Sequence, residues 1–273
     1  METIQPACSG TCSCGGAADE PQFVYALGRI EPRFPDLSLE RECGQAASAE
    51  ACILTDRQAL HNVLTAPANR YLARRMTWIF AIECIDTYVL LPRDAHDLDL
   101  LVASVRPAPK RDDIDVVVGT LGPIAPPGLA NGLALPTVRI DQIYSFDEAG
   151  LVGTIPRPAD GPEGFSANAN EALARVRQLA DNSGSTDEHR AVNYLALRDP
   201  RLYEVVARQH AANFALTEIG ARPSPLAGLR KVVEVVLAFR QRQSGVVEKQ
   251  FARVDVTGRF PFLVTPIQPF YER

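Results

Sequence analysis

One stretch in the last quarter of the chain limits the possible folds more than any other. From residue 233 to residue 239, apolar side chains recur at every second position, as in a strand with two different faces. A Ser244-Gly245 turn follows, and a second extended run continues to residue 256. This order predicts a β-hairpin between Leu229 and Val256.

Helical patterns precede this hairpin. Residues 169–180 place apolar side chains at helical spacing, residues 185–188 read Ser-Thr-Asp-Glu as a capping box, and Asp199-Pro200 predicts a further helix start. Helices followed by an antiparallel hairpin favour an α+β fold over a wound parallel sheet. For the second half we therefore predict helices and then an antiparallel hairpin.

The first half is mixed. Strand patterns alternate with helical patterns that open at Leu37, at Thr55 and after Asp94. The predicted strands are 23–30, 77–82, 87–91, 114–119 and 137–144. We predict a Cys/Gly/Ser-rich disordered tail (1–22), an α+β first subdomain (23–155), a Pro/Gly linker (156–165) and a second subdomain (166–273). The two subdomains are expected either to pack as one compact body or to stay separate.

Charge and hydropathy exclude several classes of protein. The net charge is −5, of which the tail contributes −3, so the body lacks the basic surface that a phosphate backbone requires. We therefore expect no nucleic-acid partner. No apolar run approaches the ~20 residues of a membrane helix, and the N-terminus lacks the pattern of a signal peptide. These features predict a cytoplasmic protein without a membrane partner.

Six cysteines then remain reduced by default. Cys43, Cys52 and Cys84 are expected to be small buried apolar residues. Cys8, Cys12 and Cys14 form a C-x3-C-x-C group. Three readings of that group stay open.

In the first reading the segment is only a linker. In the second, its three thiolates bind zinc or copper(I) with a fourth ligand from elsewhere, which would make the chain a metal-binding protein or a metal-dependent enzyme. In the third, its Cys, Ser and Thr residues are themselves modified, so that the chain is a precursor.

Catalytic motifs are scarce. The sequence has no G-x-S-x-G elbow, no H-E-x-x-H helix and no Walker A loop, so we assign no catalytic residue and expect that the chain is not an enzyme. Asp187, Glu188 and His189 form a polar group in which an imidazole follows carboxylates. The same residues suit the first turn of a helix, and we favour that reading.

A basic group lies in the first half. Arg57 and His61 are four residues apart on a predicted helix, and Arg70 and Arg74 follow. Such a group can grip an acidic peptide or a partner protein. The alternative is a solvated helix face with ordinary ion pairs.

Several separated segments resemble one family. FVYALGRIEPRFPDLSLERE (23–42) resembles the start of the C-terminal domain of the cyanobactin maturation proteases of the PatA and PatG type. The likeness continues in TDRQALHNVL (55–64), NRYLARRMTWIFAIE (69–83), GPIAPP (122–127), IDQIYSF (140–146), ADNSGSTDEHRAVNYLALR (180–198), ARVDVT (252–257) and GRFPFLVTPIQPFYER (258–273). The subtilisin-type contexts HGTH and GTSMA are missing, so the chain resembles that domain standing alone.

The resemblance implies an accessory role in making a ribosomal peptide natural product. The expected partners are the precursor peptide, a co-encoded maturation enzyme or a second copy of the chain. An edge strand of the second half is the expected place for a peptide to add.

Overall fold

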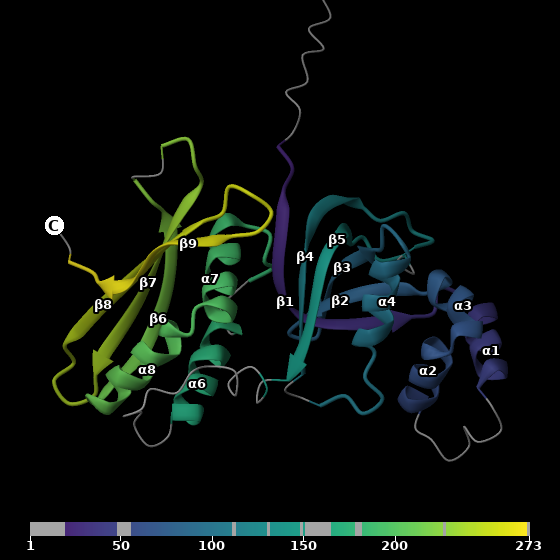
Figure 1. Cartoon of the computed structure of the whole chain (residues 1–273), viewed down its shortest axis with the longest axis horizontal. Coiled ribbons are helices and arrows are strands. Elements are labelled where there is room, and N and C mark those ends of the chain that lie inside the picture. Colours follow the sequence, from purple (N-terminus) through teal and green to yellow (C-terminus); the bar gives the residue numbers. More distant parts are fainter. Residues whose placement is uncertain are drawn as a thin grey trace, which may run out of the picture.

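The computed structural model describes residues 20–47, 56–110, 113–129, 132–147, 150, 165–177, 182–225 and 228–271. Within them the chain is an α+β protein with a closed barrel, a four-stranded sheet and helices between the two (Figure 1). The predicted fold class is therefore confirmed. Residues 1–19 and 151–164 lie outside the described part, and with them most of the predicted tail and linker.

The first half closes a five-stranded barrel in the order β1-β2-β3-β5-β4. Its strands are β1 (Phe23–Arg33), β2 (Thr77–Ile82), β3 (Ile85–Leu91), β4 (Asp113–Ile124) and β5 (Pro136–Asp147). Strand β1 changes partner midway: residues 23–28 pair with β4 and residues 29–33 pair with β2. A Cβ at Gly28 would collide with the main-chain oxygen of Ala81, so this position requires glycine.

Helices of the first half pack beside the barrel (Figure 1). They are α1 (Leu37–Ala46), α2 (Asp56–Thr65), the 3-10 helix η2 (Pro67–Asn69), α3 (Arg70–Arg75) and α4 (Ala95–Ser104). Leu39, Leu72 and Leu101 of these helices are fully buried, in one core with Phe80 and Ile140 of the barrel. The Asp94 cap of α4 is confirmed, because its carboxylate accepts hydrogen bonds from the main chain of His96 and Asp97.

The second half is an antiparallel sheet in the order β6-β7-β8-β9, covered on one side by helices. Its elements are α6 (Phe165–Arg177), α7 (Asp187–Arg198), α8 (Arg201–Ala211), β6 (Phe214–Pro223), β7 (Val232–Gln241), β8 (Val247–Asp255) and β9 (Phe262–Pro269). The predicted hairpin is confirmed as β7 and β8. Both of its strands are internal, so the edges of the sheet are β6 and β9.

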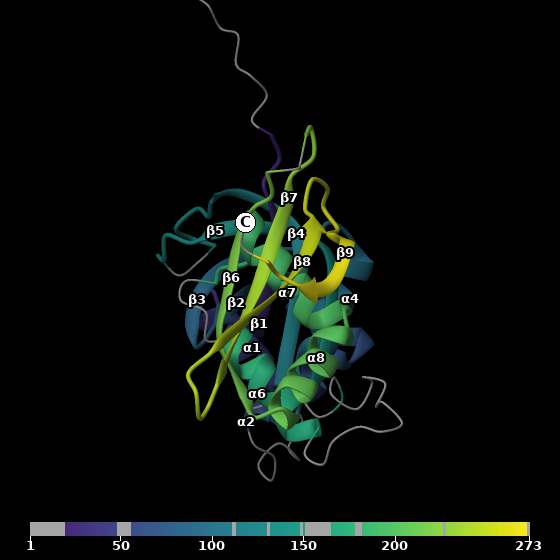
Figure 2. The ribbon, with the colours of Figure 1, turned by 90° about the vertical axis from the view of Figure 1, so that its left-hand side faces the viewer.

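Helix α7 lies between barrel and sheet, with the sheet's other side facing outward (Figures 1 and 2). Tyr25 and Val116 of the barrel share one core with Leu195 of α7 and with Val235 and Phe239 of β7. The two halves of the chain are therefore joined through a common apolar interior.

Hydrogen bonds between polar groups also join the two halves of the chain. Asn193 of α7 donates from its side chain to the main-chain oxygen of Tyr25 (2.8 Å), and Asn182 donates to the side-chain oxygen of Asn193 (2.7 Å). The N–H of Tyr25 donates to the carbonyl of Gly184 (2.8 Å), where φ is +72°. The segments 23–42 and 180–198, which carry much of the family resemblance, thus meet at this junction.

Candidate functional site

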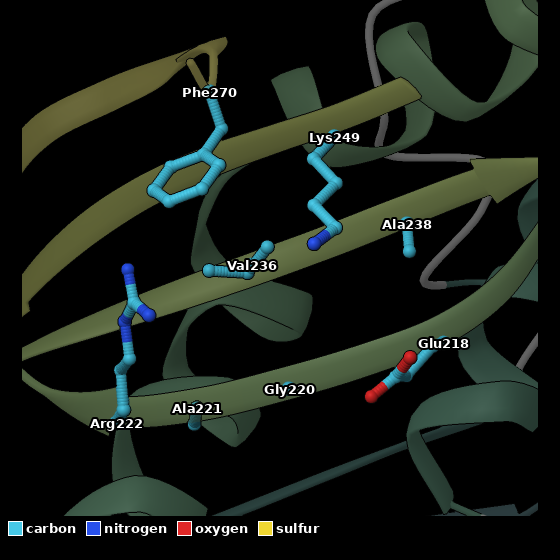
Figure 3. Close-up of a pocket in the computed structure, with 8 residues that line it drawn as sticks. All are labelled: Glu218, Gly220, Ala221, Arg222, Val236, Ala238, Lys249 and Phe270. Atoms are coloured by element: carbon cyan, nitrogen blue, oxygen red, sulfur yellow. The ribbon is translucent and has the colours of Figure 1, made fainter. Parts of the chain in front are cut away.

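The face of the C-terminal sheet that lies opposite α7 and α8, called here the outer face, carries the candidate site. Alternation along β7 buries Val235, Leu237 and Phe239 against the helices and turns Val236 and Ala238 to the outer face. A hollow with a volume of about 200 Å³ opens there (Figure 3). It is lined by Glu218, Gly220, Ala221, Arg222, Val236, Ala238, Lys249 and Phe270.

Gly220 leaves the hollow open at its centre. Glu218, Gly220 and Arg222 occupy alternate positions of β6, so they share the outer face (Figure 3). A Cβ built on Gly220 would have the Glu218 carboxylate, 4.0 Å away, as its neighbour. The hollow therefore has an apolar floor from Val236 and Ala238, Glu218 and Arg222 at its two ends along β6, and Lys249 across the sheet from Glu218.

A buried carboxylate anchors the rim of the hollow. The side chain of Glu234 is 4% exposed and accepts hydrogen bonds from Arg253 (2.8 and 2.9 Å) and Arg222 (3.3 Å). Burial opposes ionisation of Glu234, but the hydrogen bonds and charges of Arg253 and Arg222 outweigh it and lower the pKa of this carboxyl group. Glu234 therefore acts as a fixed anion that holds both guanidinium groups.

These guanidinium groups in turn stack on aromatic rings. Arg222 lies 5.3 Å from the ring centre of Phe270, and Arg253 lies 5.0 Å from that of Phe251. Phe251 and Phe270 meet edge to face at 5.6 Å. This arrangement fixes Phe270 as one wall of the hollow.

Strand β6 forms an open edge beside the hollow. In the described part of the chain, β6 pairs with β7 alone. The N–H of Ser224 donates to the carbonyl of the opposite residue, Val232, so residues 222, 220 and 218 also direct their main-chain groups toward β7. The main-chain groups of Ile219 and Ala221 consequently point to the open edge.

The basic group predicted from sequence is held by main-chain contacts rather than gathered around one cavity. Arg57 donates to the carbonyl of Arg106 (3.3 Å), and His61 Nδ1 lies 2.6 Å from the carbonyl oxygen of Val105. Burial lowers the pKa of Arg57. Arg57 also lines a cavity of about 530 Å³ between α1 and α2, but residues 48–55, which connect these helices, lie outside the described part.

Arg70 and Arg74, on α3, complete that group. Arg70 donates to the carbonyl of Ala95 (2.6 Å) and pairs with Asp99, so it ties α3 to α4. Arg74 is exposed. These contacts fit the reading of a helix surface with ordinary ion pairs, and the binding role of the four residues stays a prediction.

The polar group at 187–189 lies in the first turn of α7. Thr186 caps this helix, where the capping box placed Ser185: the Thr186 hydroxyl accepts from the N–H of His189 (3.1 Å). Asp187 pairs with Arg190 at 3.2 Å. The geometry is that of a helix start, as the favoured reading of the sequence expects.

The cysteines divide into three cases. Cys8, Cys12, Cys14 and Cys52 lie outside the described residues, so the zinc or copper reading of the tail stays a prediction. Among the residues that the structure describes, no group of three or more His, Cys, Asp or Glu side chains is arranged to hold a metal ion. Cys43 is buried, as expected.

The expectation for Cys84 is wrong. Cys84 is exposed, because it occupies the tight turn between β2 and β3 with φ +67°. A turn residue of that conformation points away from the barrel core.

Ile79 of β2 and Val89 of β3 form a small apolar cluster of their own, in which they pack under Ala125, Leu129 and Leu135 of the β4–β5 connection. The barrel therefore covers this surface of β2 and β3 with its own chain.

Across the described residues, none of the helices has the length and apolar character that crossing a membrane requires.

The sequence patterns did not predict β6 and β9, although they predicted β7 and β8, which also border the hollow. Strand β6 was not predicted because a bulge between Leu216 and Glu218 interrupts its alternation. Strand β9 was not predicted either, since Pro266 and Pro269 read as breakers although both are tolerated on an edge strand. The alternation of Leu216 with Ile219 and Ala221, allowing for one extra residue, was the available signal.

Comparison with known proteins supports the family resemblance. Residues 160–270 match the family model described as PatG C-terminal. A solved structure described as "PatG Domain of Unknown Function" superposes with a TM-score of 0.71 at 20% sequence identity, covering 91% of this chain and 98% of the other. No curated protein matches the chain. The family match confirms the predicted resemblance over residues 160–270, and the superposition shows that most of the chain shares the fold of that domain.

Proposed function

We propose that this relative of the PatG C-terminal domain is a non-catalytic accessory module in the biosynthesis of a ribosomal peptide natural product. In this proposal it binds an extended segment of the precursor peptide along the open edge of β6. Adding a strand to a sheet edge is a common mode of peptide recognition, in which main-chain hydrogen bonds supply affinity and side-chain pockets supply specificity.

One observation carries the proposal: the open edge and the hollow adjoin at Gly220. Ile219 and Ala221 direct main-chain donors and acceptors outward, while the hollow beside them has room for a side chain. Gly220 is the residue where an added strand could approach most closely. A peptide bound there would therefore gain both kinds of contact at one position.

The chemistry around the hollow favours binding over catalysis. Glu234, the buried carboxylate at its rim, has its pKa lowered by two arginines, so it is a poor general acid or base near neutral pH. The buried amides of Asn182 and Asn193 are engaged at the junction with β1. These polar groups are accounted for by structural roles.

The direct test measures precursor-peptide affinity for the wild-type chain and for Gly220→Val by isothermal titration calorimetry. Valine suits a strand and fills the hollow without a main-chain collision, so we expect unchanged thermal stability and a loss of affinity of about tenfold or more. Gly128→Val, at an exposed turn with no neighbour within 4 Å, is the matched control. Equal affinity of wild type and Gly220→Val would reject this site.

A further inference from the structure

We infer that the β6 edge reads a specific pattern in an antiparallel peptide: an acidic, a large apolar and a basic residue at alternate positions, in that order from N to C. This inference rests on the proposed function and adds the sequence that the site selects. It follows from three features of β6: its main-chain groups, the gap at Gly220, and the charges at Glu218 and Arg222.

The main-chain groups fix the length and register of the added strand. Ile219 and Ala221 present their N–H and C=O groups to the edge. On one side Pro223 has no N–H to donate, and on the other the bulge between Leu216 and Glu218 changes the register. The usable ladder therefore spans residues 218–222.

In this register Gly220 and the peptide residue opposite it form a non-hydrogen-bonded pair. The side chains of such a pair lie closer together than those of a hydrogen-bonded pair. The peptide residue opposite Gly220 therefore leans over the hollow, toward Val236, Ala238 and Phe270. A large apolar or aromatic residue covers an edge glycine well, because it packs on the surface that the glycine leaves bare.

Charges on either side of Gly220 set the direction of the peptide. Glu218 and Arg222 are both exposed and lie on the outer face with Gly220 between them (Figure 3). The side chain of Arg222 is 56% exposed even though it also contacts Glu234. Opposite charges directly across a strand pair stabilise it and like charges destabilise it. An antiparallel strand meets Arg222 first and Glu218 last, so its acid precedes its base.

A second copy of the chain fits the edge less well. Two β6 strands paired about Gly220 would set Glu218 against Arg222 of the other copy, so their charges would match. Gly220 would then face Gly220, and neither hollow would receive a side chain. The hollow thus favours a peptide with a large central residue, and self-pairing becomes an outcome that the experiment separates.

The test uses two synthetic heptapeptides with blocked ends, each built on threonine. The first carries glutamate, phenylalanine and lysine at alternate positions, and the second has glutamate and lysine exchanged. We expect the first to bind the full chain about fourfold to tenfold more tightly, because the exchange turns two attractive pairs into repulsive ones. On binding, the amides of Ile219 and Ala221 should become protected from hydrogen exchange, while that of Gly220, already directed toward β7, should change little.

A charge reversal in the protein sharpens the test. The Glu218→Lys variant should bind a peptide in which glutamate replaces the lysine more tightly than it binds the first heptapeptide. The control Glu171→Lys, an exposed change on α6, should keep the wild-type preference for the first heptapeptide. Equal affinity of the two peptides overturns the inference. It leaves the proposed function standing, provided that Gly220→Val still lowers the affinity for the precursor peptide.

Two further outcomes are decisive. Protection of Ile219 and Ala221 that rises with protein concentration in the absence of peptide assigns the edge to a second copy and overturns the inference. If neither peptide nor precursor binds, both the inference and the proposed function fail.

Discussion

The side-chain amide of Asn193 donates to the main-chain oxygen of Tyr25 across 2.8 Å, joining helix α7 to the first barrel strand. Both groups are buried, and Asn182 completes the pair by exchanging hydrogen bonds with Asn193 (2.7 and 3.1 Å). The two halves of the chain thus share a polar contact inside a common core. Whatever binds the C-terminal sheet therefore binds a surface that is joined to the barrel through this shared core.

We expect Asn193→Leu to lower the free energy of unfolding by about 3 kcal/mol. The substitution keeps the side-chain size but leaves the Tyr25 carbonyl and the Asn182 amide buried without their partner. Urea denaturation followed by circular dichroism measures the change. Asn62→Leu, an exposed position on α2, should stay within about 0.5 kcal/mol of wild type. A similar small effect for Asn193→Leu would show that this junction does not hold the halves together.

Arg190→Lys should destabilise the fold by about 2–3 kcal/mol. The guanidinium group donates to the carbonyls of Val256 (2.8 Å), Gly258 and Arg259 (3.4 Å), and a lysine ammonium cannot reach all three acceptors. Arginine at this buried position therefore holds the loop before β9. Differential scanning calorimetry should show a lower Tm for Arg190→Lys and an unchanged Tm for Arg208→Lys on the exposed side of α8. Equal Tm values for the two variants would refute the prediction.

Glu234 should make stability depend on pH in the acid range. Its folded-state pKa lies below the ordinary value of 4.5, so the folded protein binds this proton more weakly than the unfolded chain. The contribution of ionised Glu234 to the free energy of unfolding is therefore complete above pH 4.5. It is lost as the pH falls from there through the lowered pKa of Glu234 in the folded state. We expect Glu234→Gln to be less stable than wild type by about 1–3 kcal/mol at pH 7, with the difference shrinking below pH 4.5.

Guanidinium denaturation at a series of pH values from 7 to 3 measures this dependence. Glu218→Gln is the control, because that carboxylate is exposed on the same face. If the difference in the free energy of unfolding between wild type and Glu234→Gln stays constant down to pH 3, the role of Glu234 as a fixed anion is contradicted.

Cys84→Gly should stabilise the protein by about 0.5–1 kcal/mol. Cys84 has φ +67° in the turn between β2 and β3, a conformation that costs an L-residue free energy and glycine little. Thermal denaturation of Cys84→Gly against Cys84→Ala checks the cause, since alanine should give no gain. Stabilisation of equal size in both variants would point to the thiol rather than to the turn.

Local sequence patterns predicted much of the fold. The predicted strand 77–82 coincides with β2, the extended run predicted up to residue 239 lies within β7, and the Asp94 cap is in place, because each depends on neighbouring residues alone. The cap of α7 moved by one residue, from Ser185 to Thr186, since either hydroxyl can satisfy the same orphan N–H groups. Closure of the barrel was not predicted, because the pairing of β1 with β4 joins residues about ninety positions apart.

The candidate site was harder to predict than the elements. Arg57, His61, Arg70 and Arg74 were chosen because charge and spacing are visible in a sequence. The contacts of the first three with the carbonyls of residues 106, 105 and 95 are not visible there. Gly220 carries no chemical group and lies on a strand whose alternation is broken by a bulge. Its importance appears only when Val236, Ala238 and Phe270 are brought around it.

By itself the sequence determined the α+β class, the hairpin and the resemblance to the PatG C-terminal domain, because these follow from periodicity and from motifs read along the chain. Only the tertiary structure decided that β6 is an edge, that Glu234 is buried on an outward face, and that a hollow opens beside Gly220. The physical reason is that a strand becomes an edge, and a cavity stays open, because no other segment packs there. Which segments pack where depends on contacts between residues far apart in the chain.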